Sequence, residues 1–173
     1  MFREGPPLTL LVDLKSDATN TYLALRPLLQ RYETMLTTFH PGRTVTNAVT
    51  VILSGNRPRG LMEAEISRLA GYDGRLEDLQ SDASPHFIPL VSDNWTRHFA
   101  WRAHAGAGDF PAIERRKLRD IVRLAHQQGR RIRWWGTSDN AAVWKEMRDA
   151  GVDLINTDDL PGLQRFLLSA GKD

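Results

Sequence analysis

A chain of 173 residues has the size of one domain, and its 41% hydrophobic and 25% charged residues are typical of a globular protein rather than a disordered one. The 23 basic and 21 acidic residues nearly balance, at a formal charge of +2, which argues against a dedicated nucleic-acid or membrane-surface protein. The absence of cysteine excludes disulfides, thiolate metal sites and cysteine nucleophiles. No apolar run reaches the length of a transmembrane helix, and nothing in the sequence assigns a compartment.

The first half of the chain alternates predicted strands with predicted helices. Leu8–Leu14 is a nearly continuous apolar run, which is typical of a parallel strand covered on both faces. Ser16–Asp17 provides an N-cap for a following helix, and Asn47–Leu53 is the second predicted strand. We expect the next helix to occupy Pro58–Leu69, because proline is favoured in the first turn of a helix.

The first predicted helix has an apolar stripe at helical spacing. Leu25, Leu28, Leu29 and Tyr32 stand at positions i, i+3, i+4 and i+7, which predicts that they form the buried face. Pro27 lies inside this stripe, so a kink or a restart of the helix is expected there.

The second half of the chain continues the alternation. Its clearest helix carries a buried stripe that includes Leu118 and Val122 and ends at Gly129. The remaining predicted elements are strands at Ala70–Asp73, Phe87–Val91, Arg131–Trp135 and Val152–Asn156, a helix cap at Asp109, a helix from Ser138 or Asp139 to Gly151, and a last helix from Asp159 toward Gly171.

Six strand-then-helix units with short connections predict parallel strands and right-handed crossovers. Two α/β architectures fit this rhythm: a doubly wound open sheet and part of a (β/α)₈ TIM-type barrel. A closed barrel needs eight units and about 250 residues, so a barrel built from this chain is two units short. No second-domain linker is evident, and residues 1–173 are expected to form a single partial domain.

Ligands bind at the carboxyl ends of parallel strands in both architectures, so the polar residues there are the candidates for a site. Asp13 and Lys15 end the first strand two positions apart, and therefore share a face. A carboxylate at this place can ligate a hard cation, and an ammonium beside it can hold a phosphate oxygen. A structural ion pair is the simpler alternative from spacing alone.

Other strand ends carry weaker signals. The second strand leads into Ser54–Arg57, where Gly55 permits close approach of the backbone, Asn56 is polar, and Arg57 either reaches an anion or is solvated. Asp73 is either a strand-end acid or a turn acid, and the following glycine favours the turn. Asp93 and Asn94 precede Trp95 and suit a ligand cleft, with capping of a helix by one of the two as the alternative.

The last two strands add an aromatic and an amide. One of Trp134 and Trp135 should face the sheet interior, and Asn156 is placed to face the site. The histidines have no metal-ligand spacing, so a surface or packing role is expected for each, namely His40, His86, His98, His104 and His126.

Several segments together resemble one family. Leu10–Lys15 is similar to the third-strand Glu-x-Lys motif of glycerophosphodiester phosphodiesterases, with Asp13 in place of glutamate. Arg131–Thr137 resembles their seventh-strand segment, and Ala150–Asp158 resembles their closing Gly-Val-Asp-x-Ile-x-Thr-Asp segment. With Val51–Pro58 and Pro89–Trp95, the pattern is similar to the altered inheritance of mitochondria protein 6-like branch of the wider phosphatidylinositol-phospholipase-C-like superfamily.

The resemblance implies a (β/α)₈ barrel that hydrolyses phosphodiesters with Ca²⁺ or Mg²⁺. It implies that Asp13 is a metal ligand, that Lys15 is the catalytic contact to the phosphate, and that Trp135 lines the substrate cleft. Asn56, Asp93 and Asn156 are further substrate-binding candidates. The implied partner is a phosphodiester small molecule or a lipid headgroup.

The family's two catalytic histidines and its Glu-x-Asp metal pair belong to the first two strands, and this chain is expected to correspond to strands three to eight. A single carboxylate holds a hard cation weakly, so we expect weak metal binding or none. Without the histidines no general acid or base is evident, and the chain alone is expected to be inactive or nearly so. The alternative is a non-catalytic module that associates through its open sheet edges, with itself or with a partner. An open-sheet nucleotide or sugar-phosphate binder is a third, weaker reading.

Overall fold

The computed structural model describes residues 5–103 and 108–169, and the chain divides into two compact units, 1–90 and 91–173. The histidine at position 104 lies outside the described residues. None of the helices in the described part of the chain is both long enough and apolar enough to cross a membrane.

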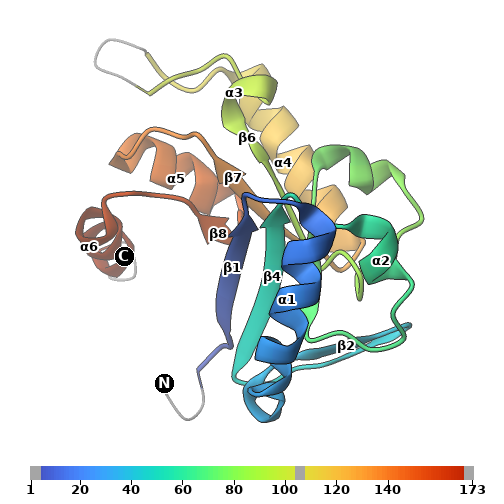
Figure 1. The fold of residues 1–173 in the computed structure, drawn as a ribbon. Helices are drawn as coiled ribbons and strands as arrows, with labels where there is room; N and C mark the ends of the chain where they lie inside the picture. Colours follow the sequence, from blue (N-terminus) through green and yellow to red (C-terminus); the bar gives the residue numbers. More distant parts are fainter. Residues whose placement is uncertain (1–4, 104–107, 170–173) are drawn as a thin grey trace. The chain divides into compact units, whose positions relative to one another are not determined.

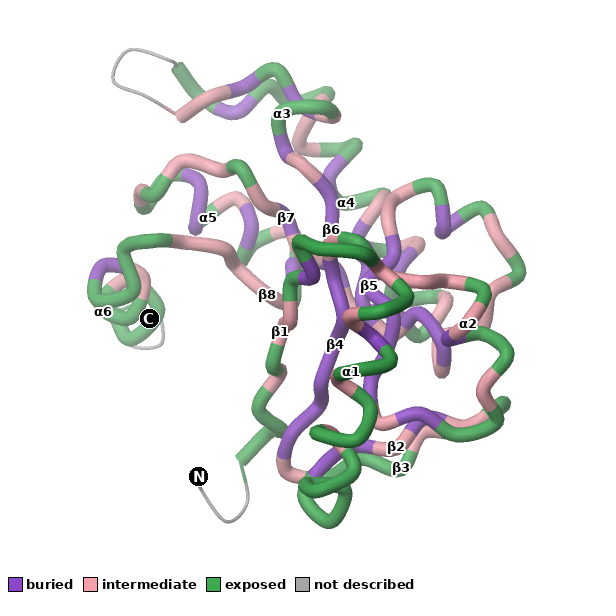
Figure 2. The backbone as a smooth tube through the Cα atoms, in the orientation of Figure 1, coloured by how far each residue is buried: buried purple, intermediate pink, exposed green. Residues whose placement is uncertain are grey.

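The first unit is built on parallel strands (Figure 1). β4 (Val49–Gly55) pairs in parallel with β1 (Leu8–Leu14) on one side and with β5 (Ala70–Gly74) on the other. β4 is buried over nearly its whole length, because its apolar residues meet other parts of the unit on both faces (Figure 2). β1 is more exposed, as expected of a strand at the end of a sheet.

Helix α1 (Ala18–Gln30) follows β1 and begins as predicted, because the carboxylate of Asp17 accepts a hydrogen bond from the amide of Asn20 at 2.8 Å. The helix continues through Pro27, so the expected restart is wrong. The predicted stripe is only partly covered, because Leu25 and Leu29 are half-buried whereas Leu28 and Tyr32 are exposed. Tyr22 is the buried residue of α1, while Leu28 is 47% exposed.

A small antiparallel hairpin lies between α1 and β4, and the sequence pattern did not predict it. β2 (Thr38–His40) pairs with β3 (Arg43–Val45) across a turn in which Gly42 has a φ of +79°. The short helix η1 (Glu33–Met35) precedes it. Phe39 anchors the hairpin, because it is 1% exposed and its backbone exchanges hydrogen bonds of 2.8 and 2.9 Å with Arg68.

The connection from β4 to β5 contains a helix that is shorter than predicted. α2 (Arg59–Glu63) stops well before residue 69, because the side chain of Arg68 returns to the carbonyls of Met62 and Glu65 and satisfies the helix end. A single helical turn, η2 (Leu76–Gln80), follows β5.

The second unit also alternates strands and helices. Its strand order is β6 (Leu90–Asn94), β7 (Arg131–Trp135) and β8 (Leu154–Ile155), and β7 pairs with β8 in parallel. The helices are α3 (Trp95–His98), α4 (Ala112–Gln127), α5 (Ala141–Ala150) and α6 (Leu160–Ser169).

The core of the second unit is aromatic. Trp134 of β7 is fully buried, and its ring lies 5.1 Å from Phe99 and 5.8 Å from Trp95 between centroids. α4 presents its predicted stripe to this core, and Arg115 joins it to α5 through two hydrogen bonds of 2.7 and 2.8 Å to Glu146. Together the two units give the α/β class predicted from the strand–helix rhythm, with six sheet strands that each lead into a helix or helical turn, apart from the hairpin.

Candidate functional site

Three polar side chains stand in a row across the first unit, at the carboxyl ends of its three parallel strands. Asp13 of β1 is the register partner of Ser54 of β4. Ser54 in turn lies one position beyond the registered pair of Leu53 and Tyr72, which places it beside Asp73 of β5. Register partners on neighbouring strands point to the same face, so all three side chains emerge on one side of the sheet.

The ion pair between Asp13 and Lys15 occupies the β1 end of this row. Lys15 Nζ lies 2.6 Å from Asp13 Oδ2, and the side chains of Lys15 and Asp13 are 83% and 48% exposed. Their spacing on the strand therefore places both groups on one face, as their positions predict. Because both are open to solvent, a ligand can replace the contact between them at little cost.

Gly55 makes room for the Asp13 carboxylate. A Cβ atom at this position would lie 2.2 Å from Asp13 Oδ1 and 2.3 Å from the carbonyl oxygen of Leu14, and the residue has a φ of +70°. Glycine is therefore required for both reasons. Asn56 holds the segment after β1, because its side-chain amide donates to the carbonyls of Lys15 at 3.3 Å and Ser16 at 3.0 Å.

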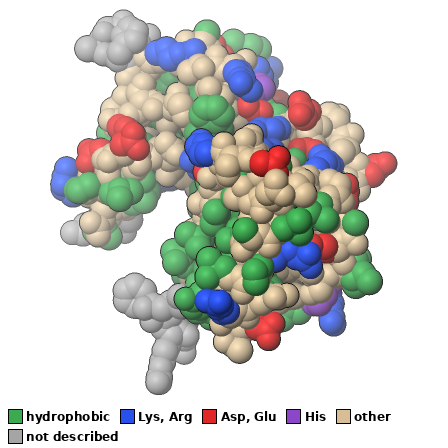
Figure 3. Space-filling model, in the orientation of Figure 1, with side chains coloured by type: hydrophobic (Ala, Val, Ile, Leu, Met, Phe, Trp, Pro, Cys, Tyr) green, Lys and Arg blue, Asp and Glu red, His purple; other side chains and the backbone are tan. Residues whose placement is uncertain are grey.

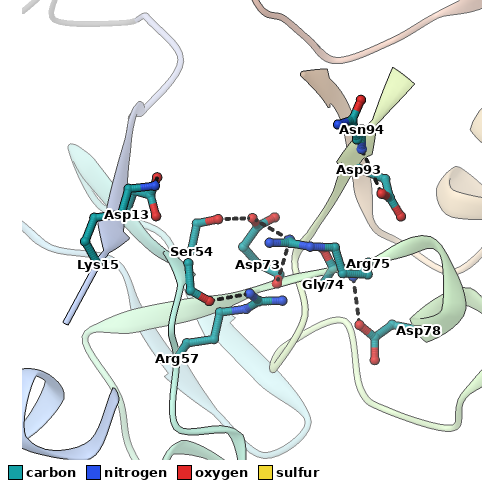
Figure 4. A network of polar contacts seen from close by, with 11 residues as sticks. Asp13, Lys15, Ser54, Arg57, Asp73, Gly74, Arg75, Asp78, Asp93 and Asn94 are labelled. Carbon is teal, nitrogen blue, oxygen red and sulfur yellow. Dashed lines mark hydrogen bonds and ion pairs between the residues drawn. The ribbon is translucent and has the colours of Figure 1, made fainter. Parts of the chain in front are cut away.

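The other end of the row is a buried carboxylate. Asp73 is 0% exposed, and its Oδ2 accepts a hydrogen bond from the Ser54 hydroxyl at 2.5 Å. The guanidinium of Arg75 contacts the same oxygen at 2.9 Å and also donates to the Gly74 carbonyl at 2.9 Å (Figure 4). The expectation that Asp73 lies in a turn is wrong, because β5 extends through Gly74.

A second acidic residue, Asp78, holds the backbone of Arg75. Asp78 accepts a hydrogen bond from the backbone amide of Arg75 at 2.8 Å through one oxygen. Its other oxygen accepts from Arg59 at 2.6 Å. The hydrogen bond to Asp78 raises the pKa of the Arg59 guanidinium.

Arg57 lies beside this cluster but has a different environment. Its Nη1 donates to the carbonyl of Gly55 at 2.6 Å, and its guanidinium carbon lies 4.6 Å from the ring centre of Tyr72. Burial lowers the pKa of Arg57, and the nearby positive charge of Arg75 lowers it further. The interpretation of Arg57 as a solvated helix-entry arginine is therefore wrong.

In the second unit, Asp93 lies near the end of β6 and is 6% exposed. Its Oδ1 accepts from the backbone amide of Asn94 at 2.7 Å, and its Oδ2 lies 3.3 Å from His98 Nε2. The cap of helix α3 is Asn94 instead, whose side chain accepts from the amide of Thr96 at 2.9 Å. Asp93 is thus a buried partner of a histidine rather than a helix cap.

The ends of β7 and β8 carry the remaining candidates. Trp134 faces the aromatic core, whereas Trp135 is half-buried on the opposite face of β7. Asn156 follows β8, and its side-chain oxygen accepts a hydrogen bond from Arg133, which shares the Trp135 face. Three of the predicted site residues, Asp13, Lys15 and Asn56, therefore meet in the first unit. The other three, Asp93, Trp135 and Asn156, belong to strand ends of the second.

Three histidines contact side chains of their own units. His86 Nδ1 lies 2.9 Å from the hydroxyl of Thr44, and His126 Nε2 lies 2.9 Å from Asp153 Oδ2. His98 contacts Asp93.

The family resemblance implies a Ca²⁺ or Mg²⁺ ion, which requires several oxygen ligands close together. In the described residues, no group of three or more histidine, aspartate or glutamate side chains is placed to hold a metal ion. Asp13 already contacts an ammonium at 2.6 Å. Hard cations take six or more oxygen ligands, so the described residues do not by themselves fit a resident cation.

The Ser54–Asp73–Arg75 cluster is the part of the site that sequence reasoning missed. In the sequence Ser54 and Asp73 stand at the ends of two separate predicted strands, and no local pattern connects them. The signal that connects them is the register between β4 and β5, which a single sequence does not reveal.

Three comparisons with known proteins found similarity to phosphodiesterase-like proteins. Residues 131–161 match the glycerophosphoryl diester phosphodiesterase family. This stretch contains the Arg131–Thr137 segment and ends just beyond the Ala150–Asp158 segment on which the resemblance was based.

A curated relative is the altered inheritance of mitochondria protein 6 of Eremothecium gossypii, which is 28% identical over 190 aligned residues. The match covers 92% of this chain and 46% of that protein, so the chain spans about half the length of its relative. Among solved structures, a glycerophosphodiester phosphodiesterase from Parabacteroides distasonis shares the fold with a TM-score of 0.56 at 15% identity. That match covers 96% of this chain and 59% of the other. These findings confirm the resemblance predicted from the motifs.

Proposed function

We propose, from the premise that this chain belongs to the glycerophosphodiester phosphodiesterase-like superfamily, that its first unit binds the phosphate of a phosphodiester. The observation that carries the proposal is the exposed pair of Lys15 and Asp13 at the carboxyl end of β1. Parallel α/β folds bind ligands at this end of their strands. The substrate class is a glycerophosphodiester or a lipid headgroup of the same chemistry.

Lys15 is the proposed phosphate contact. Its ammonium carries three donors on a flexible stem and is 83% exposed, so it can turn from Asp13 to a phosphate oxygen. There it would neutralise charge that develops on the phosphate during hydrolysis. Asn56 holds the backbone of Lys15 in place, which makes Asn56 a positioning residue in this scheme.

Asp93, Trp135 and Asn156 are proposed as substrate-binding residues of the second unit. Each lies at or just after the carboxyl end of a strand, and Trp135 offers an apolar ring beside the polar Arg133–Asn156 pair. An aromatic surface with a few polar groups suits the alcohol portion of a phosphodiester.

Asp13 is the proposed contribution of this chain to a Ca²⁺ or Mg²⁺ site. Because one carboxylate does not make such a site, further oxygen ligands from other parts of the complete protein are required. Such a cation would polarise the phosphate when bound. Metal-dependent hydrolysis is therefore proposed for the complete protein.

The isolated chain is proposed to be inactive. Hydrolysis of a phosphodiester requires proton transfer to the leaving alcohol and from the attacking group. The contacts of His86, His98 and His126 direct those rings elsewhere within their own units. Lys15 alone supplies binding and charge neutralisation, which lowers the barrier too little for measurable turnover.

Two measurements test this function. The purified chain is assayed on bis(p-nitrophenyl) phosphate with Ca²⁺ or Mg²⁺ and with a chelator, and no chelator-sensitive turnover is expected. Binding of sn-glycero-3-phosphocholine is then followed by backbone amide shifts. Lys15→Gln is expected to weaken binding about tenfold, the usual worth of a charge-assisted hydrogen bond.

Lys145→Gln provides the matched control for Lys15→Gln. Lys145 also forms an exposed ion pair with an aspartate, at 2.5 Å from Asp149, but it lies on helix α5. Its removal is expected to leave binding unchanged. Chelator-sensitive turnover would refute the inactivity of the chain, and equal affinity of the wild type and Lys15→Gln would refute the phosphate site.

A second candidate function is association through the edge of the sheet. β1 has one strand neighbour, β4, within the first unit. Its Leu8 and Leu10 side chains are 57% and 47% exposed, and apolar side chains gather over β1 and α1 in the space-filling view (Figure 3). An apolar strand edge of this kind pairs readily with another chain.

Sedimentation velocity over a concentration series tests the association. Leu10→Lys should shift an associating chain toward the monomer, because a charge on an edge strand opposes pairing. Ile66→Lys is the control, since Ile66 is 80% exposed but lies outside the strands. A monomeric wild type at all concentrations would exclude this candidate.

A further inference from the structure

The arginine that follows β4 holds a positive charge without a carboxylate partner. Arg57 forms no ion pair with any residue in the described part of the chain, and its Nε is buried without a hydrogen-bond acceptor. Its neighbours Arg75 and Arg59 are each paired, with Asp73 at 2.9 Å and with Asp78 at 2.6 Å. Arg59 also contacts Glu63 at 3.8 Å, so Arg57 is the arginine of this cluster that has no ion-pair partner among the described residues.

The surroundings of Arg57 make that charge unfavourable in the absence of a ligand. The guanidinium is half-buried and has a second guanidinium, that of Arg75, close enough to lower its pKa. The carboxylates of Asp73 and Asp78 raise the pKa but offset this effect only in part, so an added anion would stabilise the partly desolvated cation further. The group is nevertheless held in one orientation, against the face of Tyr72 and on the carbonyl of Gly55.

Gly55 connects this arginine to the proposed phosphate contact. The space left by its missing side chain is filled by Asp13 Oδ1, and its carbonyl oxygen accepts the hydrogen bond from Arg57. Asp13 and Arg57 therefore approach the same residue of β4. The planar fork of an arginine suits bidentate recognition of a phosphate or carboxylate.

We propose that Arg57 is an anion-binding residue that takes a second negatively charged group of the ligand. The ligand class is a glycerophosphodiester whose alcohol itself carries a phosphate or carboxylate. The position of the diester at Lys15 rests on the proposed function, whereas the binding of an anion at Arg57 does not. Arg57 thus acts as a specificity residue that selects anionic over neutral or cationic alcohols.

Three ligands of increasing charge test the proposal, with binding followed by backbone amide shifts of the full chain. They are sn-glycero-3-phosphocholine, glycerol 3-phosphate and glycerophosphoinositol 4-phosphate. The last is expected to bind about tenfold more tightly than the choline diester, as one bidentate charge-assisted contact allows. Arg57→Gln should remove this preference and leave the affinity for the choline diester unchanged. Arg57→Lys should retain part of it.

Arg31→Gln is the charge-matched control. Arg31 caps the end of α1 in the same unit and is exposed. Its removal subtracts the same charge and should leave the tenfold preference intact. Urea unfolding of Arg57→Gln separates binding from a structural role. A residue that only holds its turn would lower the unfolding midpoint, whereas loss of an uncompensated cation leaves the midpoint equal or higher.

The outcomes distinguish this inference from the proposed function. If both diesters bind equally and Arg57→Gln changes neither, the inference is wrong while the phosphate site at Lys15 stands. If neither diester binds but glycerol 3-phosphate binds in an Arg57-dependent way, the anion site stands and the phosphodiester assignment fails. Absence of binding by all three ligands would overturn both.

Discussion

The hydroxyl of Ser54 donates a 2.5 Å hydrogen bond to Oδ2 of Asp73, an aspartate that is 0% exposed. The same oxygen is 2.9 Å from Arg75. The contact joins the carboxyl ends of β4 and β5 and completes the row that begins with Asp13 on β1. A buried carboxylate needs such partners, because an unpaired charge in the interior is costly. The buried end of the row therefore stabilises the sheet, and its exposed end is free to exchange partners.

Replacement of Asp73 by alanine is expected to destabilise the protein strongly. It removes the carboxylate that pairs with Arg75 and the acceptor of the Ser54 hydroxyl. Breaking a buried ion pair in this way costs about 3 kcal/mol or more. Urea unfolding followed by far-ultraviolet circular dichroism measures the change. The exposed pair of Asp120 and Arg123 gives the control, because Asp120→Ala should cost less than about 1 kcal/mol. Equal midpoints for the two variants would contradict the assignment.

Two glycines of the first unit allow the cost of a left-handed backbone to be measured apart from the cost of a steric clash. Gly55 and Gly42 both have positive φ, at +70° and +79°. A Cβ at Gly42 meets nothing within 4 Å, whereas one at Gly55 meets Asp13 and Leu14 within 2.3 Å. Each alanine variant should lower the free energy of unfolding by about 1 kcal/mol or more, because alanine is strained in the left-handed conformation.

Gly55→Ala should lose further stability, because Asp13 and the end of β1 must move. It should also weaken phosphodiester binding at Lys15, while Gly42→Ala leaves binding unchanged. Urea midpoints and the amide-shift titration give the two readouts. Identical losses in the two variants would show that the approach of Asp13 to Gly55 has no energetic consequence.

The sequence pattern predicted correctly those helix and strand boundaries that are set by neighbouring residues. β1 and β7 have the predicted bounds, Leu8–Leu14 and Arg131–Trp135. A run of apolar residues bounded by turn formers specifies a buried strand without help from the rest of the chain. The end of α5 at Gly151 was also predicted, because its φ of +83° is a conformation that favours glycine.

Elements that depend on distant partners were misplaced. β6 begins at Leu90 rather than Phe87, because the carbonyl of Phe87 accepts from Tyr72 and Pro89 packs against the site of Gly71. Proline has no amide proton for a strand ladder, so the strand starts after it. Likewise, α4 is capped by Pro111 and α5 by Asn140 rather than by the acidic or hydroxyl residues predicted, since neighbouring backbone decides which residue leaves the helix.

The candidate site also contains residues that a local pattern predicts and residues that meet only through pairing of distant strands. Asp13 and Lys15 follow from the alternation of side chains along one strand, which any strand obeys. Ser54, Asp73 and Arg75 meet only because β4 and β5 pair in one register, and Arg57 is held by Tyr72 from another strand. Pairings between distant segments leave no mark in the local pattern of one sequence.

The two tryptophans of β7 are expected to differ sharply in their contribution to stability. Trp134 is 0% exposed among Trp95, Phe99 and neighbouring rings, whereas Trp135 on the opposite face is half-buried. Trp134→Ala should therefore cost about 3 to 5 kcal/mol, as expected for a large core residue. Trp135→Ala should cost about 1 kcal/mol. Tryptophan fluorescence during urea unfolding reports this, because all five tryptophans lie in the second unit. Comparable losses would contradict the orientation of β7.

Alkaline pH should destabilise the first unit through Tyr22. This phenol is 2% exposed and donates a 2.7 Å hydrogen bond to Glu65 Oε2. Burial, together with the Glu65 carboxylate, raises its pKa well above the ordinary value of 10.0. Because the folded pKa exceeds the unfolded one, this contribution to stability is complete below pH 10.0 and is lost as the pH rises toward the folded pKa. The unfolding midpoint should therefore fall from about pH 10 upward.

The tyrosine variants isolate this effect from general alkaline denaturation. All three tyrosines lie in the first unit, and Tyr32 is 53% exposed. Tyr22→Phe should lose about 1 kcal/mol at neutral pH with its hydrogen bond, but its midpoint should then fall less steeply with alkali than that of the wild type. Tyr32→Phe should keep the wild-type slope, since an exposed phenol titrates alike in both states. Ultraviolet absorbance of the phenolates should show Tyr22 ionising only as the chain unfolds. An equal alkaline slope in all three proteins would mean that the contact between Tyr22 and Glu65 does not hold the proton on the phenol.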